Sequence, residues 1–417
     1  MGERGLPVGE DRGGNVGSGP QPGGGATLSG NGREVHGGPG PLARNGGGGS
    51  PDPSHAAQAA SLAPETATHG AANPPAAAGE SDRAEGAFRI GQLNHPSEEV
   101  CPNCGHTEIR ELFAATDRLY GTTDRVFQVV ECASCRLIRL HPKPVPVELQ
   151  KYYPTDYWYV PEPATVDRME QWYRRFVLRD HLHFVERALR ESEAKGIIAD
   201  AGCGGGLFLQ MLAERGAVGR TGPVAGLDFS MDAAHAAWWR AGVPAVCGNL
   251  AQAPFAAGSC AAVTMFHVLE HLYDPASYLR AAHELLAPEG RLIVQVPNAA
   301  CWQFLLLGER WAGIDVPRHL TDFRAFDLDR LLDSCGFEVL RHKHFSLRDN
   351  PAGLATSLAP KLDPMARRVR QIAETPRQRL WSDLVYTALV VASVPFTLLE
   401  AVCRAGSTIM VEARKKS

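Results

Sequence analysis

A glycine-rich turn in the middle of the chain is the first feature that indicates chemistry. The segment from Asp200 to Gly206 reads Asp-Ala-Gly-Cys-Gly-Gly-Gly and follows a short apolar run, Ile197–Ala199. Such a run suits a buried parallel strand, and residues 207–216 after the turn favour a helix. Glycine lets the backbone turn tightly and lets a ligand approach where a Cβ would block it. The sequence therefore predicts a ligand-binding turn between a strand and a helix N-terminus.

The spacing of these glycines indicates which ligand the turn would hold. A dinucleotide fingerprint, Gly-x-Gly-x-x-Gly, would need glycine at the position of Leu207. The pattern Asp-x-Gly-x-Gly-x-Gly from Asp200 to Gly206 instead resembles the first motif of class I S-adenosylmethionine-dependent methyltransferases. In that family the turn holds the methionine part of the cofactor, so the resemblance implies S-adenosylmethionine. A tight turn with a purely structural role is the alternative.

An acid on the next predicted strand favours the same cofactor. Asp228 ends the segment Val224–Asp228, where a carboxylate can accept hydrogen bonds from both hydroxyls of a ribose. Asn249 follows a third short strand, where the family places a polar side chain against the adenine. The resemblance implies a set of cofactor-binding residues: Asp200, Gly202, Cys203, Gly204, Gly206, Asp228, Phe229, Asn249, Leu250 and His267.

A longer motif surrounds the fourth predicted strand. The segment from Gly258 to Pro275, which contains His267-Val-Leu-Glu-His271, resembles the strand and loop of the family's small-molecule branch, including quinone-ring and sugar methyltransferases. Cys260-Ala261 replaces the usual Phe-Asp, which changes a structural contact but not the implied cofactor. Val296-Pro297-Asn298 and Pro317-Arg318-His319-Leu320 resemble the same branch, where this later part lines the acceptor pocket.

Three histidines are candidates for catalysis. A sulfonium methyl group is already activated, so the protein must mainly align the acceptor and exclude water. A hydroxyl acceptor also needs a base near neutral pH, and histidine suits that role. We predict His319 as this base, with His267 and His271 as further candidates. The alternatives are that His271 pins the loop after the fourth strand and that His267 packs in the cofactor pocket.

Two Cys-x-x-Cys pairs precede these motifs. Cys101 and Cys104 form one pair, and Cys132 and Cys135 form the other, with room for a hairpin between them. Four thiolates can hold Zn²⁺ tetrahedrally in a closed, structural site. We therefore predict structural zinc, with a redox dithiol as the alternative and His106 as a competing ligand. The remaining cysteines are scattered singly, which argues against a disulfide framework and favours a reducing cytoplasm.

The elements that must position these residues alternate as strands and helices. This alternation predicts an α/β, Rossmann-like open sheet with parallel strands. Seven strands are expected, over Ile197–Ala199, Val224–Asp228, Ala245–Cys247, Ala261–His267, Arg291–Val296, Phe337–Lys343 and Thr408–Ala413. Helices are expected over Met231–Ala241, Ala276–Leu286 and Leu328–Cys335. An amphipathic helix over Val166–Glu193 would precede the first strand and cover the cofactor site.

Composition divides the 417 residues into three parts. Residues 1–88 are rich in glycine, proline and alanine, so they cannot bury enough apolar area to fold and are predicted to be disordered. A zinc-ribbon-like module is expected over 89–145, and a methyltransferase domain over 146–417 with an apolar helical insertion at about 350–405. The net charge of −4 implies no general attraction to nucleic acid. No signal peptide is recognised, so a cytoplasmic location is expected.

An uncharged apolar run, Leu384–Leu399, lies between Asp383 and Glu400. It is shorter than the roughly 20 residues that a helix needs to cross a bilayer, and Pro395 interrupts it. The chain must also return to the sheet at Thr408, which argues against a single crossing. The run docks on the protein as a lid or lies in a membrane interface, and a true membrane span is the least favoured alternative. Interfacial anchoring would give peripheral membrane contact and would allow a lipid-linked acceptor.

These features together predict an enzyme that transfers a methyl group from S-adenosylmethionine to a small molecule. The expected acceptor is a hydroxyl or ring carbon of a sugar, a quinone or another biosynthetic intermediate. One alternative is a methyltransferase that acts on protein or nucleic acid, with the zinc ribbon as reader. The other is a non-enzymatic scaffold with a degenerate methyltransferase fold. The sequence does not predict the oligomeric state.

Overall fold

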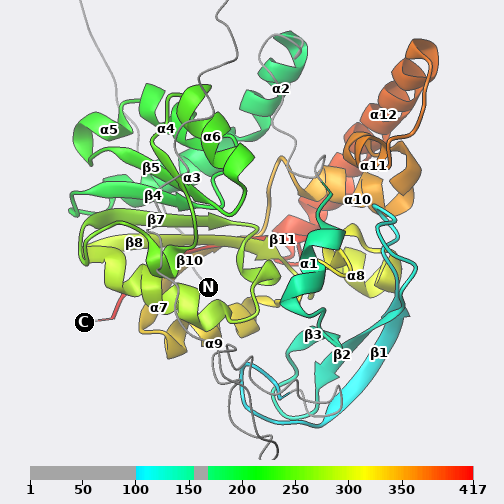
Figure 1. Ribbon diagram of the computed structural model, residues 1–417, viewed down its shortest axis with the longest axis horizontal. Coiled ribbons are helices and arrows are strands. Elements are labelled where there is room, and N and C mark those ends of the chain that lie inside the picture. The colour runs from blue at the N-terminus through cyan, green and yellow to red at the C-terminus, as the bar shows by residue number, and fades with distance from the viewer. Residues whose placement is uncertain (1–99, 155–167, 417) are drawn as a thin grey trace, which may run out of the picture. The chain divides into compact units, whose positions relative to one another are not determined.

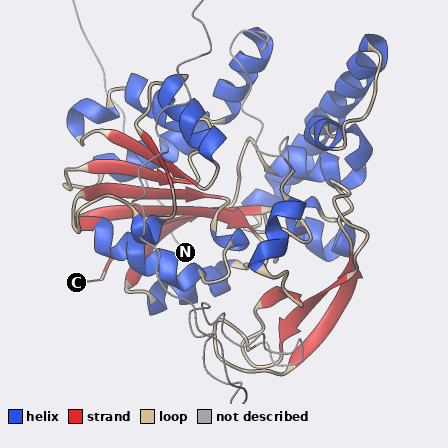
Figure 2. Ribbon diagram, viewed as in Figure 1, coloured by secondary structure: helices blue, strands red, loops and turns tan. Residues whose placement is uncertain are grey.

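The apolar runs of the sequence come together as one seven-stranded sheet within the part of the chain that the structure describes (Figures 1 and 2). The computed structural model describes residues 100–154 and 168–416, so the predicted disorder of residues 1–88 falls outside it. The strand order is β10, β11, β8, β7, β4, β5, β6. The strands are β4 Ile197–Ala201, β5 Val224–Asp228, β6 Ala245–Cys247, β7 Cys260–Phe266, β8 Leu286–Pro297, β10 Phe337–Lys343 and β11 Thr408–Lys415. The predicted Rossmann-like fold is confirmed.

Helices cover both faces of this sheet and give it two separate cores. One face carries α3 (Arg179–Arg190), α4 (Leu207–Glu214) and α6 (Met231–Trp239), and the other carries α7 (Pro275–Leu285) and α9 (Ala325–Ser334) (Figure 1). A short helix, α5 (Ala217–Arg220), follows α4. The first core includes Leu182, Leu209, Ile198 and Ile293, and the second includes Leu279, Leu328, Val263 and Val294. Neighbouring residues of one strand thus face opposite cores, as a sheet buried on both sides requires.

The sheet is mixed, which corrects the prediction of parallel strands. β11 runs antiparallel to both β8 and β10, whereas the pairs among β4 to β8 are parallel. Lys343 lies opposite Met410, and Pro297 lies opposite Thr408. The chain therefore leaves β10 and returns in β11 at the same edge, so β11 must run in the opposite direction. This edge is the carboxyl-terminal edge of the parallel strands, where open α/β sheets bind ligands.

The helix predicted over Val166–Glu193 is two helices, which is a second correction. Within the described residues α2 spans Arg168–Val177 and α3 spans Arg179–Arg190, with Leu178 between them. Leu182, Val185 and Leu189 of α3 are buried against the sheet, whereas Trp172 of α2 is exposed. The helical periodicity therefore identified the packed face of α3 but not the break before it.

The cysteine pairs belong to a second, four-stranded sheet. Its order is β1 (Ile109–Ala115), β2 (Phe127–Cys132), β3 (Ile138–His141) and β9 (Thr321–Asp322), all antiparallel. β1 and β2 pair between the two cysteine pairs, where the sequence leaves room for a hairpin, and α1 (Pro146–Tyr152) follows β3. Because β9 comes just after His319, the segment that carries this histidine is attached directly to the cysteine-bearing sheet.

A helical excursion separates β10 from β11. It contains α10 (Asn350–Leu358), α11 (Pro364–Val369) and α12 (Pro376–Val402), which lie together in Figure 1. The expectation that the helix here is too short to cross a bilayer and is interrupted at Pro395 is wrong, because α12 has 27 residues and Pro395 lies inside it. The prediction counted only uncharged residues, whereas the helix begins earlier, at the Thr375 cap, and runs through Arg377 and Asp383.

In length and composition α12 suffices for a membrane crossing, and no other described helix does. Only 17% of its most apolar window of 18 residues is buried inside the protein.

Candidate active site

The glycine turn between β4 and α4 is held in a left-handed conformation. The φ angles of Gly202 and Gly204 are +79° and +52°, a region that residues with a Cβ rarely adopt. A Cβ on Gly202 would meet the Val268 side chain at 2.7 Å, whereas a Cβ on Gly204 would meet no atom within 4 Å. The turn is thus packed on one side against the loop after β7, and at Gly204 it leaves space for a ligand beside the N-terminus of α4.

Asp228, at the end of β5, contacts this turn directly. Its Oδ2 accepts a hydrogen bond from the Gly204 N–H at 2.9 Å, and its Oδ1 accepts one from the Ser230 N–H at 2.9 Å. Burial raises the pKa of Asp228, although the two N–H donors counteract this effect. Each carboxylate oxygen retains a further lone pair, so Asp228 can still accept hydrogen bonds from ribose hydroxyls. The structure therefore brings together the two features on which the cofactor prediction depends.

Asp200 and Cys203 support the turn from within the protein. Asp200 Oδ1 accepts a hydrogen bond from Thr264 Oγ1 of β7 at 2.5 Å, and burial raises the pKa of Asp200 to about 7. Cys203 is buried, and its Sγ occupies the space that a Cβ on Gly226 of β5 would need. Both side chains therefore connect the turn to neighbouring strands.

The residues expected near the adenine lie along the same edge of the sheet. The Phe229 ring is exposed, with its centroid 6.2 Å from that of Tyr278. Asn249 Oδ1 accepts a hydrogen bond from the Gln252 N–H at 3.0 Å, and Leu250 is buried. In this structure Asn249 therefore caps its own short helical turn, and its contact with adenine stays a prediction.

His267, just beyond β7, lies in a network of buried polar groups. Its Nδ1 is 3.1 Å from Glu270 Oε1, and its Nε2 is 3.4 Å from Asp349 Oδ2. Gln295 Nε2 donates to Asp349 Oδ2 at 2.7 Å and lies 2.8 Å from His267 Nε2. Burial alone would lower the pKa of His267, but the carboxylates of Asp349 and Glu270 outweigh it and raise the pKa to about 9. His267 is therefore a proton donor near neutral pH, and it is a poor candidate for a general base.

His271 and His319 lie against each other beside Glu270. Their ring centroids are 4.7 Å apart, with the rings nearly perpendicular. His271 Nδ1 is 3.1 Å from the Arg318 carbonyl oxygen and 3.0 Å from Tyr153 Oη, and His319 Nδ1 is 2.9 Å from the Gly313 carbonyl oxygen. Burial, together with the neighbouring His319, lowers the pKa of His271 to about 4. The structure thus assembles all three predicted histidines at the carboxyl-terminal edge of the sheet, with His267 and His271 on either side of Glu270.

Sequence reasoning missed part of this network. Asp349 comes from the excursion after β10, and His181 Nε2 of α3 lies 3.9 Å from it. On the other side of the His181 ring, Nδ1 forms a hydrogen bond with Asp180 Oδ1 at 2.9 Å. Asp180 Oδ2 accepts a further hydrogen bond from Lys343 Nζ at 2.8 Å. Charged residues in short loops carry no local signal for such a network, because their partners are distant in sequence. Only the polar pair Asp180-His181, on the apolar face of a helix, could have suggested it.

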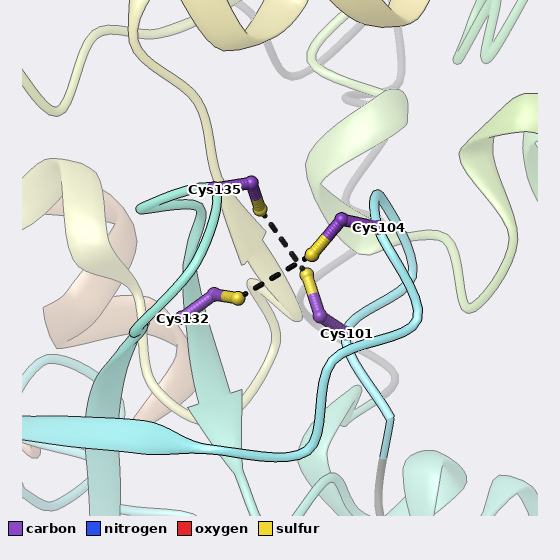
Figure 3. A group of neighbouring side chains, drawn as sticks. All are labelled: Cys101, Cys104, Cys132 and Cys135. Carbon is purple, nitrogen blue, oxygen red and sulfur yellow. Dashed lines mark hydrogen bonds between the residues drawn. The ribbon is translucent and has the colours of Figure 1, made fainter.

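The four predicted zinc ligands form a cluster with their side chains directed toward one another (Figure 3). Cys101 Sγ lies 3.5 Å from Cys135 Sγ, and Cys104 Sγ lies 3.5 Å from Cys132 Sγ. All four sulfur atoms are within 4.8 Å of one another. Zinc bonds of about 2.3 Å in a tetrahedron require sulfur atoms at about these separations, so the donor set and its spacing fit a structural zinc ion.

Comparison with known proteins agrees with the fold and with the glycine turn. The family described as "Methyltransferase domain" matches residues 173–342, which include the turn, Asp228 and all three histidines. A protein of Mycolicibacterium smegmatis named "Probable S-adenosylmethionine-dependent methyltransferase" is 32% identical over 174 residues, 40% of this chain and 60% of that protein. A ubiquinone biosynthesis O-methyltransferase of Pectobacterium carotovorum is 30% identical over 179 residues, 40% of this chain and 72% of that enzyme. The chain thus spans less than two thirds of the mycobacterial relative.

The solved structures to which this chain is similar are more distant in sequence. The 1,6-didemethyltoxoflavin-N1-methyltransferase of Burkholderia thailandensis is 15% identical, with a TM-score of 0.37, and the match covers 71% of this chain and 97% of that enzyme. An S-adenosylmethionine-dependent methyltransferase from Mesorhizobium loti is 16% identical, with a TM-score of 0.35, and the match covers 57% of this chain and 98% of that one.

Proposed function

Because the chain belongs to the S-adenosylmethionine-dependent methyltransferase family, we propose that it methylates a hydroxyl or a ring carbon of a small molecule. The observation that carries the proposal is the contact between Asp228 and the Gly204 N–H, which joins the expected ribose acid to the glycine turn. Several relatives are named ubiquinone biosynthesis O-methyltransferases, and this supports a small-molecule acceptor. The alternative acceptors are protein and nucleic acid, and the alternative to an enzyme is a scaffold.

The described residues fit the cofactor. Gly204 leaves open space at the turn, and Asp228 has lone pairs available for ribose hydroxyls. Phe229, Asn249 and Leu250 would lie along the adenine. When bound, S-adenosylmethionine supplies a methyl group on a positively charged sulfur. The chain's own residues would orient the acceptor, exclude water and remove a proton from a hydroxyl, the role that we propose for His319.

We also propose that Cys101, Cys104, Cys132 and Cys135 hold a structural zinc ion. Four thiolates leave no position for a substrate, so this ion would stabilise the cysteine-bearing sheet without taking part in the reaction.

Calorimetric titration with S-adenosylhomocysteine tests the cofactor assignment. The wild-type chain should bind one equivalent, and Asp228→Asn should weaken binding about tenfold or more, since a charge-assisted hydrogen bond contributes about 1.5–3 kcal/mol. Asp232→Asn is the matched control, because this exposed acid of α6 lies close in sequence and should leave the affinity unchanged. Absence of binding by the folded wild-type chain would favour the scaffold.

A further inference from the structure

His267 has a backbone conformation that is unfavourable for a residue with a Cβ. Its φ angle is +58°, in the left-handed region that such residues rarely adopt. A conformation of this kind persists only where the surrounding structure enforces it. At His267 the chain leaves β7 and enters a loop whose first side chain, Val268, packs against Gly202 of the cofactor turn. The conformation of His267 therefore determines how this loop meets the turn.

The His267 ring has a charged partner on each side. Its Nδ1 lies 3.1 Å from Glu270 Oε1, and its Nε2 lies 3.4 Å from Asp349 Oδ2. The His267 N–H donates to the Gln295 carbonyl oxygen at 2.9 Å, and Gln295 Nε2 donates to the same Asp349 oxygen at 2.7 Å. Glu270 belongs to the loop that His267 begins, whereas Asp349 reaches the ring from the excursion after β10. Asp349 therefore fixes the ring relative to a segment that is distant in sequence.

Asp349 is itself held in place. Its Oδ2 accepts a hydrogen bond from Ser346 Oγ at 2.6 Å, and its N–H donates to the same Ser346 oxygen at 3.1 Å. The next residue, Asn350, is fully buried, and its Oδ1 accepts a hydrogen bond from Thr408 Oγ1 of β11 at 2.5 Å. Burial alone would raise the pKa of Asp349, but the charge of His267 outweighs it and holds the pKa well below its ordinary value. Asp349 is thus a carboxylate near neutral pH, and its position is fixed by the large sheet.

We propose that Asp349 is a positioning residue for cofactor binding, which holds His267 in the left-handed conformation and thereby keeps Val268 against the glycine turn. This inference rests on the proposed function, because the turn is where the cofactor is proposed to bind. The family match ends at residue 342, so the excursion that carries Asp349 lies outside it. The excursion therefore contributes to the cofactor site through one carboxylate, although its helices follow the matched domain.

Calorimetric titration of the full chain with S-adenosylhomocysteine tests this role. Asp349→Asn removes the charge that holds His267 and should weaken binding about tenfold, because the loop can then relax to a backbone conformation that residues with a Cβ prefer. Asp363→Asn is the matched control, because this acid of the same excursion accepts hydrogen bonds from Thr356 and Tyr386. It should bind S-adenosylhomocysteine like the wild type. An equal loss of affinity in both variants would overturn the proposal, since general loosening of the excursion would then explain it.

Substitution of His267 separates positioning from a purely structural role. His267→Ala and His267→Gly both remove the ring, but only glycine adopts the left-handed conformation without a steric penalty. The glycine variant should bind S-adenosylhomocysteine about fivefold more tightly than the alanine variant, and Asp349→Asn should cause no further loss in the glycine background.

Equal affinities of the two His267 variants would contradict the proposal, and this comparison holds even if Asp349→Asn does not fold. A full effect of Asp349→Asn in the glycine background would contradict it as well. If the folded wild-type chain does not bind S-adenosylhomocysteine, the proposed function fails and this inference fails with it, whereas binding by the wild type with unchanged variants rejects the inference alone.

Discussion

Arg318 holds the segment before β9 against the loop after β1 through a single side chain. Its guanidinium is fully buried and donates to both oxygens of Asp117, at 2.8 and 3.0 Å, and to Asp315. It also lies over the Tyr120 ring, 4.5 Å from the centroid. Since His319 is the next residue, the position of that imidazole depends on this buried ion pair. The sequence predicted that Pro317–Leu320 lines the acceptor pocket, but the role that the structure gives Arg318 is to hold this segment in place.

Replacement of Asp117 tests that role. Burial alone would raise the pKa of Asp117, but Arg318 outweighs it and lowers the pKa to about 2. Because the folded-state pKa lies below the ordinary value of about 3.9, the stability from this pair is present above pH 4 and is lost as pH falls toward about 2. Asp117→Asn should lower the free energy of unfolding at pH 7 by about 2–3 kcal/mol and reduce its dependence on pH in that range. Urea denaturation from pH 7 to pH 2 measures both effects.

Asp124→Asn is the control for this measurement, because Asp124 is an exposed acid in the same loop. It should unfold like the wild type. If Asp117→Asn were as stable as this control at pH 7, the buried pair would have no stabilising role.

Local pattern was sufficient for some site residues and insufficient for others. The glycine turn could be predicted from the spacing of its glycines directly after an apolar strand. Asp228 could be predicted because it is an acid at the end of the next strand. The contact of His271 with His319, and of His267 with Asp349, could not be predicted, because folding brings these residues together from separate segments. The three histidines lie at one edge of the sheet, but their protonation depends on carbonyl groups and carboxylates that no motif encodes.

Among the elements, α12 has an unusual distribution of side chains. The residues that it buries are polar, Ser393, Thr397 and Glu400, and Glu400 accepts hydrogen bonds from Gln303 of α8 (Trp302–Leu307). Its large apolar side chains are mostly exposed, including Leu380, Trp381, Leu384, Val385, Val391, Leu398, Leu399 and Val402. Leu305 and Leu306 of α8 are exposed as well. A surface helix normally has the opposite pattern, so this apolar face favours the membrane-interface interpretation over a docked lid.

Vesicle sedimentation tests this interpretation. We expect the chain to sediment with anionic phospholipid vesicles, because apolar side chains enter the interface, Arg377 and Arg379 lie near the start of the helix and Arg404 follows its end. The double change Leu384→Glu with Leu398→Glu should reduce the bound fraction about tenfold or more without loss of folding, because both side chains are exposed. Trp239→Glu on α6 is the control for an exposed apolar residue elsewhere. Wild-type chain that stays in the supernatant at both low and high salt would exclude membrane contact.

Sequence periodicity located the strands well because apolar runs and glycines mark their ends. Phe337–Lys343 and Val224–Asp228 have the predicted bounds, and Ser230 caps α6 by accepting from the Ala233 N–H. β8 begins at Leu286, earlier than the predicted Arg291, and it runs through Pro288 and Gly290, residue types that usually interrupt a strand. The sequence did not predict that β11 runs antiparallel to its neighbours. Strand direction depends on which edge of the sheet the connection from β10 returns to, and the composition of that connection does not indicate the edge.

For the molecule beyond residue 99, the cysteine cluster is part of the main framework. β9 pairs with β3, and Cys101, Cys132 and Cys135 belong to the same apolar core as α7 and α9. The segment with His319 lies between this sheet and the larger one. Loss of the cluster should therefore affect the whole unit.

Zinc removal tests this coupling. Treatment with a chelator, or the change Cys104→Ser, should lower the melting temperature as one cooperative transition, because metal-binding free energy contributes to folding. Cys403→Ser is the control, because this exposed cysteine lies at the end of α12. Differential scanning calorimetry distinguishes the outcomes. A separate small transition, with the main one unchanged, would indicate an independent module.

The pairing of Lys343 with Met410 also has a consequence for engineering. Both ends of the excursion already lie side by side as the arms of a hairpin, so a tight glycine-containing linker can join them directly. Such a shortened chain would keep the strand order while deleting α10, α11, α12 and Asp349. Comparing its cofactor affinity and its stability with those of the full chain would measure what the deleted helices and Asp349 contribute.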